Sequence, residues 1–174
     1  MVNTDYLHSK WVKMNISSTD EDEKQVRISA SLKLSCLKDI EDFKTEKGLF
    51  GGRSDFVLAA LRYYYYSRIG LADSYLAKLD DGLSSSQKMN QLKKLISKDV
   101  NDNINSYETF YNGSEKQQVL ISVSKYMDDC INDLAILSGK KTSDIIIAAI
   151  ASYRIELLEK MHLRDEFIKA VNKL

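Results

Sequence analysis

The stretch VRISASL at residues 26–32 decides the fold, because apolar and polar residues alternate along it without a break. A period of two is typical of a β-strand with one buried face. Apolar residues then take helical spacing over residues 36–43, and Gly48 suits a helix end. After a glycine-rich turn, Arg53-Ser54-Asp55 supplies cap-type residues for a second helix. The predicted order is strand, helix, turn, helix.

The same order recurs later in the chain. Alternation returns at residues 118–123, helical spacing follows up to Gly139, and Thr142-Ser143-Asp144 opens another helix. Offsets of 91 for the strand and first helix, and 89 for the second helix, align identical residues: Ser31/Ser122, Ile40/Ile131, Asp42/Asp133, Gly48/Gly139, Ser54/Ser143, Asp55/Asp144, Ala59/Ala148, Ala60/Ala149 and Tyr64/Tyr153. The two-residue difference falls in the turn, where an insertion costs least. The chain therefore carries a tandem repeat.

The repeats divide the chain into four parts. Residues 1–23 are polar and acidic without an apolar period, and we expect a flexible arm. Residues 24–70 form the first unit, and residues 116–174 form the second unit with a helical extension. Between them, residues 71–115 are expected to form a helical connector. It comprises a short helix that ends near Asp81-Gly82 and a long helix whose apolar face needs a partner.

Composition indicates a folded, mainly helical chain. Its 174 residues suffice for one domain or two small ones, and 44% hydrophobic residues are too many for a disordered chain. With no proline and seven glycines, few residues break a helix. The 25 basic and 25 acidic residues balance, yet residues 24–70 hold 9 basic and 5 acidic residues, a net charge of +4. The first unit is therefore locally basic.

Several classes of protein are disfavoured by what the sequence lacks. It has no apolar run of about 18 residues and no secretion signal, so we expect a cytoplasmic protein without a membrane partner. Two cysteines, Cys36 and Cys130, and two isolated histidines, His8 and His162, do not match a metal site or a histidine-based triad. We expect no catalytic residues, no metal and no cofactor.

The segment LAILSGKKTSDII at residues 134–146 resembles the pattern L-A-x-x-x-G-x-x-R-S-E-L-I of the ribbon–helix–helix family of MetJ, Arc and CopG repressors. The resemblance covers residues 26–66 and 118–155. The first copy departs from the pattern by its longer turn, LFGG. Neither copy has the proline often found where the first helix starts, and Lys33 and Ser124 stand there instead.

The resemblance implies a mainly α fold in which two units pair their strands as an antiparallel two-stranded ribbon. Pairing is needed because a lone strand cannot satisfy its backbone groups and two short helices bury little surface. With both units on one polypeptide, an intramolecular pseudo-dimer is expected. The alternative pairs each unit with its copy in a second chain, as a homodimer or higher oligomer.

The resemblance also implies a site for double-stranded DNA, since the family places the exposed face of its ribbon in the major groove. By alternation, that face carries Arg27, Ser29, Ser31, Gln118, Leu120 and Ser122. Arg27 suits guanine and Gln118 suits adenine, whereas Leu120 suits a thymine methyl group or indicates that its strand reads little. The alternative interpretation is that all six are ordinary solvent-facing residues.

Family members also anchor the DNA backbone at the start of the second helix, where free N–H groups and the helix dipole favour a phosphate. This implies phosphate contacts by Arg53, Ser54, Lys140, Lys141, Thr142 and Ser143. Such contacts position a protein without reading sequence. Plain helix capping is the alternative role for these positions, and the two roles are compatible.

Other distinctive residues are expected to be structural. The four tyrosines at residues 63–66 point in different directions on a helix, so core or interface packing is favoured over base stacking. Cys36 and Cys130 lie within helical patterns and are expected to be buried as small hydrophobic residues.

The resemblance implies a cytoplasmic, nucleoid-associated transcriptional repressor that binds double-stranded DNA in a sequence-specific way. The main alternative is a protein–protein interaction module such as an antitoxin, with its partner held by the connector or the tail. An accessory protein of DNA partition or conjugation would use the same ribbon. Enzymatic activity is not expected.

Overall fold

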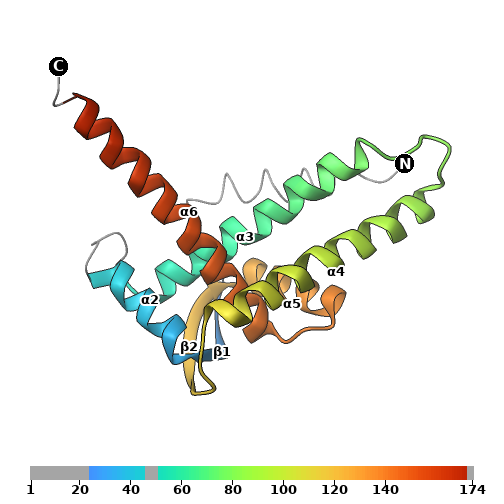
Figure 1. The fold of residues 1–174 in the computed structure, drawn as a ribbon. Helices are drawn as coiled ribbons and strands as arrows, with labels where there is room; N and C mark the ends of the chain where they lie inside the picture. Colours follow the sequence, from blue (N-terminus) through green and yellow to red (C-terminus); the bar gives the residue numbers. More distant parts are fainter. Residues whose placement is uncertain (1–23, 46–50, 172–174) are drawn as a thin grey trace.

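The computed structural model describes residues 24–45 and 51–171 of the chain, so the arm expected at residues 1–23 and the helix end expected at Gly48 lie outside the described residues. The described part is mainly helical, with one two-stranded antiparallel sheet. Its elements are β1 (Gln25–Lys33), α2 (Leu34–Thr45), α3 (Arg53–Leu76), α4 (Ser85–Phe110), β2 (Lys116–Ser124), α5 (Lys125–Ser138) and α6 (Thr142–Val171). The predicted order of strand, helix and helix is thus present twice (Figure 1).

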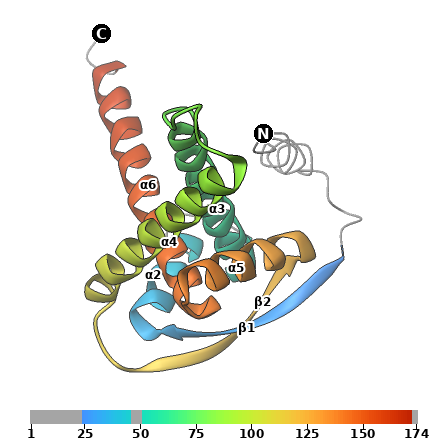
Figure 2. The same cartoon turned by 90° about the vertical axis from the view of Figure 1, so that its right-hand side faces the viewer.

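The strands β1 and β2 form a ribbon by pairing with each other within the one chain. All nine residues of each strand are in register, from Gln25 opposite Ser124 to Lys33 opposite Lys116. Ser29 and Leu120 face each other at the middle of the register. Figure 2 shows the ribbon along one edge of the molecule, with the helices on one side of it.

Alternation along the strands separates a buried from an exposed face, as the sequence predicts. Ala30 and Leu32 of β1 and Val119, Ile121 and Val123 of β2 are almost inaccessible to solvent. They pack against helical residues in one contiguous core, including Ile40, Phe56, Tyr64, Met127, Ile131 and every residue of the segment 145–151. Burial of this apolar surface is the main force that holds the helices to the ribbon.

The connector differs from the expectation in one respect. The separate short helix expected after residue 71 is instead the last part of α3, which continues without a break to Leu76. Continuation is favoured because Ile69 and Ala72 are buried and therefore keep the helix packed beyond the repeat. The long helix is present as α4, and Ser84 caps it in a capping box with Gln87.

The apolar face of α4 finds its partners inside the same chain. Leu92, Ile96, Val100 and Ile104 are buried, and α4 packs against α3, α5 and α6. Arg68 of α3 and Asp99 of α4 form an ion pair at 2.7 Å, with side chains only 12% and 24% exposed. The connector is therefore an integral part of the core.

The second unit ends in one long helix. Gly139 terminates α5 in the left-handed conformation, with φ of 65°, and α6 then runs on into the expected tail. Residues 145–151 in its first half are buried, whereas Leu158, Leu163, Ile168 and Val171 of its second half are exposed. Figure 1 shows this half extending away from the other helices. Among the described helices, none is long and apolar enough to cross a membrane.

Candidate nucleic-acid interface

Six side chains predicted to read DNA lie together on the solvent side of the ribbon. Cross-strand pairs join them as Arg27 with Ser122, Ser29 with Leu120, and Ser31 with Gln118. All are exposed except Ser31, which is half-buried. We call this set, Arg27, Ser29, Ser31, Gln118, Leu120 and Ser122, the exposed ribbon face.

The exposed ribbon face combines hydrogen-bonding groups with one apolar side chain. The amide nitrogen of Gln118 donates a hydrogen bond to the Ser29 hydroxyl, which links the two strands on the solvent side. Leu120 is 64% exposed at the centre. Neither strand contains an aspartate or a glutamate. The face is therefore free of the carboxylates that would repel a polyanion.

Two serines tie the helix N-termini to the strands in a reciprocal manner. The Ser143 hydroxyl of α6 accepts a hydrogen bond from the main-chain N–H of Ser31 at 3.1 Å. The Ser54 hydroxyl of α3 accepts one from the main-chain N–H of Ser122, also at 3.1 Å. Each unit therefore uses a serine of its second helix to hold the strand of the other unit.

These bonds add a role that sequence reasoning missed. Both strands of a two-stranded sheet are edge strands, so some of their N–H groups need partners outside the ladder. The identities Ser54/Ser143 and Ser31/Ser122 in the repeat were the available signal. A hydroxyl that accepts a bond still has its own hydrogen to donate, so phosphate binding by both serines remains compatible with the geometry.

The basic residues predicted at the helix N-termini differ in their surroundings. Arg53 forms an ion pair with Glu41 of α2 at 3.1 Å, which offsets its charge. Lys141 is exposed, Lys140 and Thr142 are half-buried, and the Lys141 main-chain N–H donates to the Asp144 carboxylate at 3.2 Å. The start of α6 thus offers two lysines beside the ribbon, whereas the start of α3 offers one paired arginine.

Further lysines at the ends of the ribbon were not among the predicted site residues. Lys33 and Lys116 face each other at one end, and the Lys33 ammonium donates to the main-chain oxygens of Glu108 and Tyr111. At the other end, the Lys125 N–H donates to the Lys24 carbonyl, and the Lys125 ammonium pairs with Asp129 at 2.6 Å. Lys24 and Lys116 are exposed, and the predicted strands were too short to include them.

The tyrosines and cysteines occupy structural positions, as expected. Tyr64 is fully buried and Tyr65 nearly so, and Tyr63 packs against the Tyr153 ring. Burial raises the pKa of the Tyr64 hydroxyl to about 12. Cys36 is also fully buried, and burial raises the pKa of its thiol to about 12. These groups therefore stay neutral at physiological pH and belong to the core.

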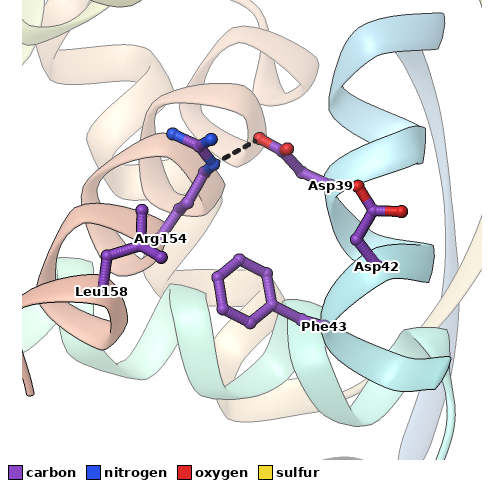
Figure 3. Close-up of a pocket in the computed structure, with 5 residues that line it drawn as sticks. All are labelled: Asp39, Asp42, Phe43, Arg154 and Leu158. Carbon is purple, nitrogen blue, oxygen red and sulfur yellow. Dashed lines mark ion pairs between the residues drawn. The ribbon is translucent and has the colours of Figure 1, made fainter. Parts of the chain in front are cut away.

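A small pocket lies between α2 and α6, lined by Asp39, Asp42, Phe43, Arg154 and Leu158 (Figure 3). Arg154 pairs with Asp39 at 3.0 Å, and the Tyr111 hydroxyl donates to the same carboxylate oxygen at 2.9 Å. These contacts join α2, α6 and the end of α4. The polar groups at the pocket wall therefore serve to fasten helices together.

No family model, curated protein or solved structure matches the chain.

Proposed function

We propose that the chain is a sequence-specific double-stranded DNA-binding protein that places its ribbon in the major groove and acts as a transcriptional repressor. The observation that carries the proposal is the exposed ribbon face, with Arg27, Gln118 and three serines over strands that contain no carboxylate. The major groove admits a two-stranded ribbon, and these side chains match the donors and acceptors of base edges. A repressor of this kind blocks transcription by occupying a promoter.

We further infer that the two units form an intramolecular pseudo-dimer of the ribbon–helix–helix kind. Pairing of β1 with β2 within the chain supports this, as does the exchange of serine hydrogen bonds between the units. One chain then supplies both strands of the ribbon. It needs no second copy to present a complete reading surface.

The helix N-termini beside the ribbon are suited to hold the DNA backbone. Ser54 and Ser143 bring the first turns of α3 and α6 against the strands, where the positive end of each helix dipole favours phosphate. Gly52 precedes α3 and contributes no side-chain cap. Lys140 and Lys141 add positive charge at α6. These contacts would fix the register of the ribbon in the groove.

A protein partner is the second candidate, and the apolar residues of α6 favour it. Leu163 is 68% exposed, and Leu158, Ile168 and Val171 are 42–49% exposed on the half of the helix that extends from the body. Exposed apolar surface of this kind suits a binding partner. An antitoxin would combine this surface with the ribbon. A partition or conjugation protein would use the ribbon in the same way.

Fluorescence anisotropy with a duplex of random sequence tests the proposal. We expect binding that weakens steeply as salt rises, because phosphate neutralisation releases counterions. Arg27→Ala is expected to weaken binding, whereas Lys94→Ala removes one exposed charge on α4, outside the ribbon, and serves as the matched control. Absence of binding at low salt, or equal effects of the two substitutions, would overturn the proposal.

A further inference from the structure

The register of the ribbon and the repeat in the sequence share one centre. The repeat relates residues of the two strands that are 91 positions apart, such as Ser31 and Ser122. Only one cross-strand pair in the register is also 91 positions apart, namely Ser29 and Leu120. An approximate twofold axis relating the strands therefore passes through this pair. About this axis, Arg27 is equivalent to Gln118, and Ser31 to Ser122.

The residues that fasten the ribbon are identical about the axis. Ser31 and Ser122 donate their main-chain N–H groups to Ser143 and Ser54, and both hydrogen bonds measure 3.1 Å. Each strand is therefore held by the equivalent serine of the other unit, although the bond from Ser31 is partly buried and the bond from Ser122 is exposed. These two hydrogen bonds therefore do not distinguish the two orientations of a duplex.

The side chains expected to contact bases differ between positions that the same axis relates. Arg27 offers only donors, whereas the equivalent Gln118 offers a donor and an acceptor. At the centre, Ser29 lies opposite Leu120, whose side chain is 64% exposed. Arginine matches the two acceptors of guanine, and glutamine matches the acceptor and donor of adenine. Leucine has no hydrogen-bonding group and matches the methyl group of thymine.

We infer that the chain reads a non-palindromic duplex in one orientation, with guanine at Arg27, adenine at Gln118 and a thymine methyl group at Leu120 near the centre. This inference rests on the proposed function. Arg27 and Gln118 lie four residues apart along the ribbon, which is about 13 Å at the rise of a β-strand. That distance corresponds to about four base-pair steps. The guanine and the adenine therefore lie on opposite sides of the central thymine.

Selection of bound duplexes from a randomised pool tests the inference directly. The wild-type chain is expected to select an asymmetric sequence with these three bases in this order. Gln118→Arg places arginine at both positions 27 and 118, and the variant is expected to select guanine in both halves of the DNA site. Leu120→Ser places serine on both strands at the central pair with Ser29 and is expected to remove the preference for thymine. A palindrome selected by the wild type, or a sequence unchanged by Gln118→Arg, would overturn the inference.

Uracil in place of the central thymine isolates the methyl contact, because the two bases differ only by that group. The wild-type chain is expected to lose about fourfold in affinity, as for one buried methyl group. Leu120→Ser is expected to bind both duplexes equally, and an equal loss for both proteins would contradict the role of Leu120. If the chain binds DNA but its selected sequence and affinity do not respond to these base and side-chain changes, only the inference is refuted. If the chain binds no duplex, both the inference and the proposed function are refuted.

Discussion

Replacing Ser143 with alanine removes the hydrogen bond that joins the start of α6 to the main chain of Ser31. That bond is 3.1 Å long and partly buried, whereas the equivalent bond from Ser122 to Ser54 is exposed. A lost hydrogen bond costs about 1 kcal/mol, and more where water does not replace the lost partner. We therefore expect Ser143→Ala to lower the free energy of unfolding by about 1.5 kcal/mol, and Ser54→Ala by about 0.5 kcal/mol.

Urea unfolding measures both losses. With a slope of about 2 kcal/mol per molar urea, the midpoint is expected to fall by about 0.75 M for Ser143→Ala and by about 0.25 M for Ser54→Ala. The double variant is expected to show the sum, because the two bonds lie on opposite sides of the ribbon centre. Ser67→Ala is the matched control, since the Ser67 hydroxyl donates a hydrogen bond within α3, to the Tyr63 carbonyl. A larger loss for Ser54→Ala than for Ser143→Ala would refute the reasoning.

Three further predictions concern the exposed ribbon face and the core. Arg27→Lys keeps the charge but loses two-pronged binding, so the salt dependence of DNA binding should stay while discrimination for guanine falls about tenfold in competition titrations. Arg68→Met leaves the Asp99 carboxylate, which is 24% exposed, without its ion pair; a loss of about 2 kcal/mol is expected in urea unfolding, and Asp99→Leu should recover part of it. Because burial raises the pKa of Cys36 from 9.0 to about 12, the unfolded chain releases that proton first, and stability should fall as pH rises from 9 to 12. Cys36→Ala should reduce the slope of the free energy of unfolding against pH by about 1.4 kcal/mol per pH unit, as measured by unfolding at several pH values.

Periodicity predicted those parts of the fold that depend on one buried face. Alternation at residues 26–32 and 118–123 indicated both strands and separated Ala30 and Ile121 from the exposed side chains. The repeat likewise indicated that Ser54 and Ser143 hold equivalent positions. These features follow from local spacing, which a single sequence displays.

Contacts between distant segments could not be read in the same way. Two contacts depend on how the helices lie against the ribbon: the ion pair of Arg53 with Glu41, and the hydrogen bond that the Ser122 N–H of β2 donates to Ser54. The length of α3 was missed because burial of Ile69 and Ala72 depends on neighbouring elements in space. Contacts of this kind leave no periodic pattern in the sequence, because the packing of the assembled core determines which side chains meet.

The ribbon separates stability from recognition by using different atoms for each. Main-chain N–H groups of Ser31 and Ser122 hold the helices, whereas the side chains of Arg27, Gln118 and Leu120 point to solvent. Substitutions at Arg27 and Leu120 should therefore change the free energy of unfolding by less than about 0.5 kcal/mol, whereas a substitution at Gln118 also removes its exposed hydrogen bond to Ser29 and should cost about 0.5 kcal/mol. Substitutions at Ser54 and Ser143 should lower stability while leaving the selected DNA sequence unchanged. A variant of the first kind that unfolds the chain, or of the second kind that alters the selected sequence, would show that the two roles share side chains.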